Sequence, residues 1–118
     1  MTRLPGRPTI VCLCGSVRFL ADFDAASLAE TLAGRMVLSV GSHRQRDEDA
    51  LGHLPAGERA AALDRLAELH RHKIDLADEI LVINPGGYVG HHTQQEIDYA
   101  RAQGKRVRWL MCPERPGL

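Results

Sequence analysis

The residue best suited to chemistry is Glu96, which follows an apolar run and a glycine-rich bend. Residues 80–83 are apolar and mostly β-branched, a pattern that predicts a buried parallel strand, and the bend at 85–87 ends it. Ligands of open α/β sheets bind at the carboxyl ends of such strands, so we expect Glu96 to face a ligand from the first turn of the next helix. There the helix dipole favours the ionised carboxylate that a nucleophile or general base requires. The alternative is that Glu96 only compensates the dipole.

A second candidate site is the sequence Cys14-Gly15-Ser16-Val17-Arg18, which joins an expected strand to an expected helix. Gly15 permits close approach of the backbone to a ligand, and Ser16 and Arg18 offer a hydroxyl and a cation to phosphate oxygens. The loop has the glycine pattern of neither a Walker A loop nor a dinucleotide-binding turn. The alternative is that Ser16 only caps the helix and Arg18 is an ordinary surface charge.

The elements that position these residues alternate along the chain. We expect strands at 9–13, 36–40, 80–83 and 106–111 and helices at 17–33 and 58–76, with a third helix carrying Glu96 and ending at Gln103. The first helix carries Phe19, Leu20, Phe23, Leu28 and Leu32 at roughly helical spacing, and the second carries Leu63, Leu66, Ala67, His70 and Ile74 on one stripe. This order predicts a single α/β domain over 1–118, with a parallel sheet of four to five strands and helices on both faces. The polar segment 41–57 is long for a connector, and we interpret it as a lid over the pocket.

Composition favours a small-molecule ligand. The 118 residues include 15 basic and 15 acidic side chains, so no overall charge indicates a nucleic acid partner. No stretch suits a signal peptide or a membrane span, which predicts a cytoplasmic protein. The three cysteines lack metal-type spacing, and Cys12 and Cys14 lie in an apolar run, so we expect buried, reduced thiols and neither a metal nor another cofactor. A redox use of Cys12 and Cys14 is a weaker alternative, because no Cys-x-x-Cys motif is present.

Helix geometry separates the other titratable residues. The helix before a parallel strand runs antiparallel to it, so Asp75 and Asp78 should lie at the end of the sheet away from the ligand and be structural. The rise is about 1.5 Å per helical residue and about 3.3 Å per strand residue. His70 should therefore lie partway from that end of the sheet toward the ligand end, and Asp64 should lie closer to the ligand end. His70 could therefore approach a bound sugar or base, or it could be a half-buried residue bonded to a carbonyl. Adjacent histidines His91 and His92 lack a closed ligand set for a metal and suit donors to a ligand.

Two segments together resemble a known family. The loop from Cys14 to Arg18 looks like the first loop of the 2'-deoxynucleoside 5'-monophosphate N-glycosidases. The segment 70–100 resembles small proteins of the wider nucleoside 2-deoxyribosyltransferase-like superfamily. In order, the residues that carry this second resemblance are His70, Lys73, Ile74, Ala77, Asp78, Gly87, Tyr88, Val89, Gly90, Thr93, Glu96 and Ile97.

The resemblance implies a flavodoxin-like sheet, a homodimer or larger assembly, and cleavage of the N-glycosidic bond of a nucleoside 5'-monophosphate. It implies that Glu96 is the nucleophile, that the second titratable group is at His70, and that the 5'-phosphate is held by Gly15, Ser16 and Arg18. The sugar and phosphate site would be shaped by Gly87, Tyr88, Gly90, His92 and Thr93. The chain departs from the family in having His70 in place of an acidic residue, Gly90 in place of Asp or Ser, and His91-His92 in place of an acidic residue and Ser. These departures favour the alternative of a nucleotide-binding module without catalysis.

Overall fold

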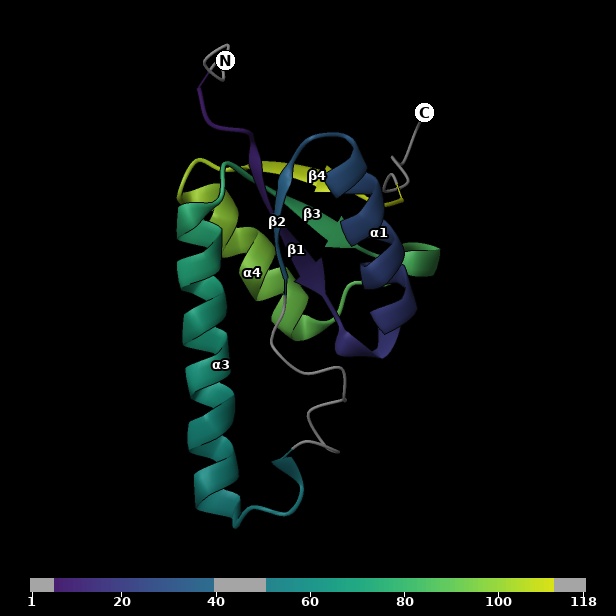
Figure 1. Ribbon diagram of the computed structural model, residues 1–118. Coiled ribbons are helices and arrows are strands. Elements are labelled where there is room, and N and C mark those ends of the chain that lie inside the picture. Colours follow the sequence, from purple (N-terminus) through teal and green to yellow (C-terminus); the bar gives the residue numbers. More distant parts are fainter. Residues whose placement is uncertain (1–5, 40–50, 112–118) are drawn as a thin grey trace, which may run out of the picture.

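The sheet has four parallel strands, as the alternating sequence pattern predicts. The computed structural model describes residues 6–39 and 51–111 (Figure 1). Its strands are β1 (Ile10–Gly15), β2 (Met36–Leu38), β3 (Glu79–Ile83) and β4 (Arg106–Trp109). They are arranged in the order β2-β1-β3-β4, and every neighbouring pair is parallel. The order is that of the first four strands of the flavodoxin-type doubly wound sheet, and it places a topological switch point between β1 and β3.

Helices cover both faces of this sheet (Figure 1). The helix α1 (Leu20–Leu32), which follows a 3-10 turn at Val17–Phe19, lies on one face. The helices α3 (Ala56–Leu76) and α4 (His91–Ala102) lie on the other, and α3 extends far beyond the sheet in Figure 1. A second 3-10 turn, Pro85–Gly87, connects β3 to α4.

Alternate residues of β1 pack into two halves of the core, one on each face of the sheet. Val11 and Leu13 pack with Phe23 and Ala26 of α1, whereas Cys12 and Cys14 pack on the α3 and α4 side with residues such as Ile74. All four β1 side chains are fully buried. This period of two follows from strand geometry, and it directs both thiols toward the same face of the sheet.

The helices α1 and α3 have two features that the sequence pattern does not indicate. In α1, Leu28 and Leu32 are exposed, and the buried face is formed by Phe23, Ala26 and Glu30. The helix α3 begins at Ala56, so residues 56 and 57 belong to its first turn and not to the connecting loop. Residues 41–50, which make up most of the segment 41–57 interpreted as a lid, lie outside the described residues.

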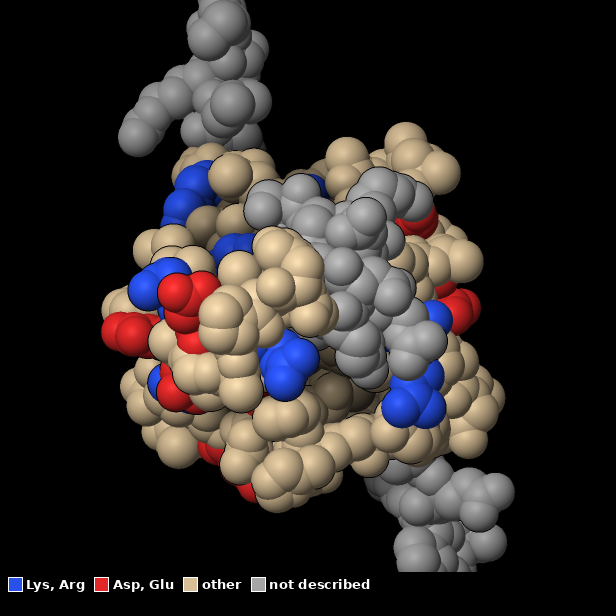
Figure 2. All heavy atoms as spheres, turned by 90° about the horizontal axis from the view of Figure 1, so that it is seen from below, with Lys and Arg blue, Asp and Glu red and all other residues tan. Residues whose placement is uncertain are grey.

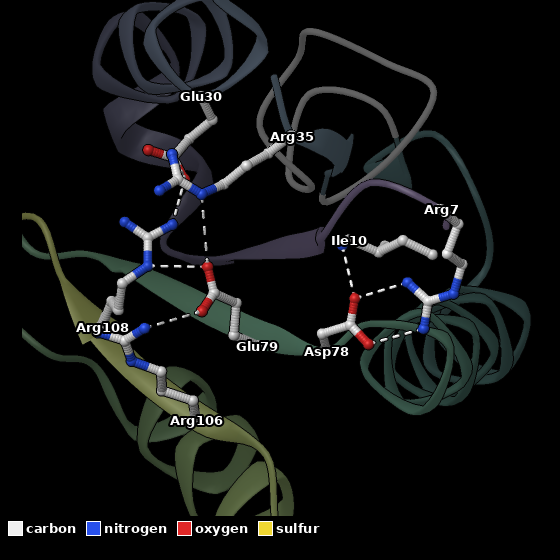
Figure 3. A network of polar contacts seen from close by, with 8 residues as sticks. All are labelled: Arg7, Ile10, Glu30, Arg35, Asp78, Glu79, Arg106 and Arg108. Carbon is white, nitrogen blue, oxygen red and sulfur yellow. Dashed lines mark hydrogen bonds and ion pairs between the residues drawn. The ribbon is translucent and has the colours of Figure 1, made fainter. Parts of the chain in front are cut away.

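The amino ends of the strands carry a network of paired charges (Figure 3). Glu79, buried at the start of β3, accepts a hydrogen bond of 3.0 Å from Nε of Arg108, which also contacts Glu30. Asp78 pairs with both terminal nitrogens of Arg7 at 2.6 and 2.7 Å and accepts a bond from the Ile10 N–H. As expected, Asp78 makes structural contacts at this end of the sheet. Within residues 6–39 and 51–111, no helix combines the length and the apolar character that a membrane span requires.

Candidate active site at the carboxyl ends of β1 and β3

A pocket of about 630 Å³ lies at the switch point between β1 and β3. It is lined by the loop after β1, the side of α3 and the first two turns of α4, including Ser16, Arg18, Asp64, His70, Thr93 and Glu96. Figure 2 views the molecule from below, the direction in which the β1 arrow points in Figure 1, and shows a hollow with basic side chains on two sides. The location is the one where doubly wound sheets bind ligands, and the volume suits a small organic molecule.

Glu96 has its two carboxylate oxygens in different environments. Oε2 lies 3.5 Å from Nε2 of His70. Oε1 is buried and has no hydrogen-bond partner among the described residues. Burial raises the pKa of Glu96 to about 7, and the neighbouring His70 offsets this only in part. One oxygen thus contacts His70, and the other is a buried acceptor without a partner among the described residues.

The position of Glu96 on its helix differs from the expected one. α4 begins at His91, so Glu96 lies in the second turn and no acidic residue lies in the first. The helix dipole acts mainly within the first turn, whereas burial acts on Glu96 directly and disfavours its charged form. The expected lowering of the pKa of Glu96 is therefore wrong, and the carboxyl group changes its charge near neutral pH.

His70 extends from α3 toward a group of buried polar atoms. Its Nε2 is 3.3 Å from Sγ of Cys14 and 3.8 Å from Sγ of Cys12, in addition to its contact with Glu96. His70 is buried, and its partners among the described residues are thiols and a carboxylate rather than the carbonyl of the alternative interpretation. Burial alone lowers the pKa of His70, but the bond to Cys12 and the charge of Glu96 outweigh burial and raise it.

The two thiols titrate as a pair. The hydrogen bond from Cys14 lowers the pKa of Cys12 to about 6 although burial opposes this, and His70 adds to the lowering. The same bond and burial raise the pKa of Cys14 well above its ordinary range. The pair therefore favours a single thiolate stabilised by a neighbouring thiol and an imidazole. Sequence reasoning missed this cluster, although the Cys-x-Cys spacing already directed both side chains to one face.

The first loop lines the pocket but differs in detail from a phosphate cradle. A Cβ atom on Gly15 would lie 2.8 Å from the Ile83 carbonyl oxygen, so the glycine is required first by packing between β1 and β3. The Ser16 hydroxyl accepts a hydrogen bond from the Arg18 N–H and caps the short 3-10 turn. The guanidinium of Arg18 is stacked over the Tyr88 ring at 4.7 Å. Arg18 is thus exposed at the mouth of the pocket and is held there by an aromatic face.

The loop after β3 brings some predicted residues into the pocket and leaves others outside. Tyr88, Gly90, His92 and Thr93 line the pocket, and Gly87 does not. Gly87 has a φ of 81°, so its role is to make the turn. A Cβ atom at Gly90 would lie 3.2 Å from the Tyr88 hydroxyl, so a larger residue here requires only a small shift of the Tyr88 side chain. The described residues contain one group with the arrangement of metal ligands, and neither His91 nor His92 belongs to it.

No family model, curated protein or solved structure matches this chain. The assignment of a function therefore rests on the chemistry of the pocket.

Proposed function

We propose that the protein cleaves the N-glycosidic bond of a nucleoside or deoxynucleoside 5'-monophosphate, with Glu96 as the nucleophile. The observation that carries the proposal is the asymmetric carboxylate of Glu96, with Oε2 beside His70 and Oε1 buried without a partner among the described residues. A buried acceptor without a partner costs free energy, so a ligand atom that interacts with Oε1 recovers that cost.

The chemistry of the reaction suits this arrangement. An N-glycosidic bond breaks through a transition state with oxocarbenium character, in which positive charge develops on the sugar ring. Oε1 of Glu96 would attack C1', the bond to the base would break, and the base would leave with the electron pair of that bond. Water then hydrolyses the glycosyl-enzyme, whereas attack by a second base completes a transfer.

Other pocket residues suit a nucleoside monophosphate. Arg18 and Arg71 line the pocket and offer cations to a phosphate, and Figure 2 shows basic side chains on two sides of the hollow. The faces of Tyr88 and His92 offer surfaces for a sugar or base. The resemblance of the first loop and of residues 70–100 to the nucleoside 2-deoxyribosyltransferase-like superfamily supports the same substrate class.

His70 acts in this proposal as a positioning residue. It is more deeply buried than Glu96, with side-chain exposures of 5% and 22%, and it contacts the oxygen that does not attack. A protonated His70 stabilises the ionised carboxylate that the nucleophile requires. We therefore expect replacement of His70 to lower kcat and to shift the pH profile, with a smaller effect on KM.

The alternative is a nucleotide-binding module without catalysis. It is favoured by the raised pKa of Glu96, since part of the population carries a neutral carboxyl group at neutral pH. It is also favoured by Gly90 and by His91-His92, where the similar enzymes have acidic residues or serine.

The two functions are separated by an assay for base release. The protein is incubated with the common ribo- and deoxyribonucleoside 5'-monophosphates, and the freed base is measured by chromatography. We expect release from at least one nucleotide, and rapid quenching followed by mass spectrometry should detect a sugar phosphate attached to Glu96.

The matched pair of variants is Glu96→Gln and Asp98→Asn, both on α4. Asp98 is exposed and contacts only the side chain of Gln94 among the described residues. We expect Glu96→Gln to abolish release and still bind the nucleotide, and Asp98→Asn to resemble the parent. Tight nucleotide binding without any release would establish the binding module instead.

We further propose that the protein is a homodimer or larger. The helix α3 carries Leu63, Leu69 and Leu76 at 40%, 50% and 67% exposure, and it extends beyond the sheet in Figure 1. Leucines that remain exposed on a long helix are typical of association surfaces. Light scattering at assay concentration measures the mass directly, and a monomer would contradict this part of the proposal.

A further inference from the structure

The buried cluster beside Glu96 contains two thiols that the proposed base release does not use. Cys12, Cys14 and His70 place two sulfur atoms and one nitrogen within 4.8 Å of one another, and all three side chains are buried. Glu96 has a carboxylate oxygen 3.5 Å from the same His70 nitrogen but lies outside the group of atoms within 4.8 Å of one another. Sulfur, imidazole and carboxylate are the ligands that Zn²⁺ prefers in proteins.

The distances from His70 Nε2 to the two sulfur atoms agree with the edges of a tetrahedron around one ion. With Zn–S of about 2.3 Å and Zn–N of about 2.0–2.1 Å, tetrahedral geometry separates sulfur from nitrogen by about 3.5 Å. Nε2 of His70 lies 3.3 and 3.8 Å from the two sulfur atoms, on either side of that value. By the same arithmetic an imidazole nitrogen and a carboxylate oxygen lie about 3.3 Å apart, close to the 3.5 Å between His70 and Glu96.

A disulfide between Cys12 and Cys14 is a poor alternative. Both cysteines are free in the structure. Residues two apart in a strand lie about 6.6 Å apart with parallel side chains, close to the upper limit of about 6.8 Å for a disulfide. The arrangement therefore keeps the two sulfur atoms side by side, as ligands of one ion must be, without joining them.

The charges also suit a bound dication. Lys73 donates a hydrogen bond of 2.7 Å to the Ser39 carbonyl and lies near enough to Cys12 to lower the pKa of that thiol. Two thiolates and the carboxylate of Glu96 carry three negative charges, which Zn²⁺ and the Lys73 ammonium neutralise together. A buried group of charges that sums to zero avoids much of the cost of an unpaired ion.

We propose that Cys12, Cys14 and His70 bind one Zn²⁺ ion at the floor of the pocket, and that a movement of the Glu96 side chain brings its carboxylate to the ion as the fourth ligand. Binding displaces the protons of the two thiols, which leave to solvent. The inference goes beyond the proposed base release and is measured without any nucleotide. Because the ion would occupy the carboxylate that attacks C1', Zn²⁺ would act as an inhibitor of base release.

The binding test uses the full chain, reduced and freed of metal by a chelator. Titration with Zn²⁺ in competition with a chromophoric chelator should give one ion per chain. Co²⁺ serves as a spectroscopic probe, and it should show thiolate charge-transfer absorption together with the intense visible bands of a tetrahedral site. A Co²⁺ complex of the parent protein without thiolate charge transfer would overturn the proposal, whatever the variants do.

Matched variants locate the ion. Loss of an outer partner alone costs about 10–100-fold in metal affinity, so Cys14→Ser and His70→Ala should each weaken Zn²⁺ binding at least about 100-fold. Their controls are Cys112→Ser, the remaining cysteine of the sequence, and His72→Ala, whose side chain is 67% exposed on the same helix. Equal losses of Zn²⁺ affinity in His70→Ala and His72→Ala would overturn the proposed metal site. Glu96→Gln should weaken binding and retain the thiolate absorption of the Co²⁺ complex.

Activity provides a separate measurement. If the metal-free protein releases base, an equimolar addition of Zn²⁺ should abolish release, and a chelator should restore it. Release that is unchanged at saturating Zn²⁺ would exclude Glu96 as a ligand. If no nucleotide releases its base, the proposed function fails, and the Zn²⁺ titration still decides the metal site.

Discussion

The buried carboxylates at the two ends of the sheet differ in the number of their charged partners. At the amino ends of the strands, Glu79 lies within reach of Arg35, Arg106 and Arg108, and Glu30 contacts Arg108 (Figure 3). At the carboxyl ends, Glu96 has a single imidazole neighbour for one oxygen and none for the other among the described residues. Both carboxylates lie beside strands of the same sheet, so the difference comes from the partners that the fold supplies.

This difference separates stability from function within one small domain. A buried carboxylate with several guanidinium partners is stabilised as an ion, and removing it leaves charges of one sign together. A buried carboxylate with an unpartnered oxygen destabilises the fold and is typical of sites that exchange water for a ligand. The amino ends thus contribute paired charges that stabilise the sheet, and the carboxyl ends contain the unpaired acceptor on which the proposed substrate and metal sites depend.

The sharpest test of the comparison is the pair Glu79→Gln and Glu96→Gln. Glu79→Gln leaves Arg35, Arg106 and Arg108 with Glu30 as the one remaining carboxylate that the structure places beside them, and we expect the free energy of unfolding to fall by about 2–3 kcal/mol. This is slightly less than the ~3–5 kcal/mol of a fully buried pair, because Arg108 is 23% exposed. Glu96→Gln replaces a carboxyl group whose charged form is disfavoured by burial with a neutral amide, and we expect a change within about 0.5 kcal/mol or a gain in stability.

Both variants are measured by urea denaturation at neutral pH, with Asp98→Asn as the exposed control. The slope against urea should stay constant, so that a shift in midpoint reports stability alone. Equal losses in the two Gln variants would show that the carboxylates have the same structural role, and the comparison would then fail.

The sequence predicts the sheet better than it predicts which side of a helix is buried. Alternation of apolar runs and helical spacing locates all four strands, because their β-branched segments are short and bounded by glycine or polar residues. Apolar spacing alone does not identify the buried face of α1, since Glu30 is buried and pairs with Arg108, which is 78 residues away, whereas Leu28 and Leu32 are exposed. Local spacing contains no information about a partner at that separation.

The same limit applies to the candidate site. The rise per residue correctly places His70 partway up α3, near the ligand end, and Asp78 at the opposite end. Contact between His70 and the thiols depends on the rotation of α3 about its axis, which apolar spacing alone does not determine. The raised pKa of Glu96 depends on burial by neighbouring elements, so the sequence, which shows only a helix start, indicates the wrong direction.

A prediction of intermediate size concerns the rim of the pocket. Arg18→Ala should weaken binding of a nucleoside 5'-monophosphate by about 1.5 kcal/mol, or roughly tenfold, the lower end of the range for a hydrogen bond to a charged group. The lower end applies because Arg18 is exposed and already interacts with the Tyr88 ring. Binding of the free nucleoside should change little. Calorimetry with both ligands measures the two effects, and Arg101→Ala, in the exposed last turn of α4, is the control.

Equal losses for nucleoside and nucleotide would show that Arg18 supports the loop and does not bind phosphate. The carboxyl end would then contribute a carboxylate and a metal cluster without a phosphate site, and the comparison between the two ends would rest on Glu96 and the thiols.

The smallest expected effect is the pH dependence that Asp78 adds at the amino end. The hydrogen bonds from Arg7 and from the Ile10 N–H hold the pKa of Asp78 below its ordinary range. A carboxyl group with a lowered folded pKa stabilises the fold above its unfolded pKa, and this contribution is lost as the pH falls below about 4. The effect is small because the side chains of Arg7 and Asp78 are 58% and 39% exposed.

Urea midpoints measured from about pH 6 to pH 2 should therefore fall less steeply for Asp78→Asn than for the parent, while Asp98→Asn follows the parent. Parallel curves for Asp78→Asn and the parent would show that the pair adds no acid sensitivity, and the contribution of the amino end would then reside in the buried Glu79 network alone.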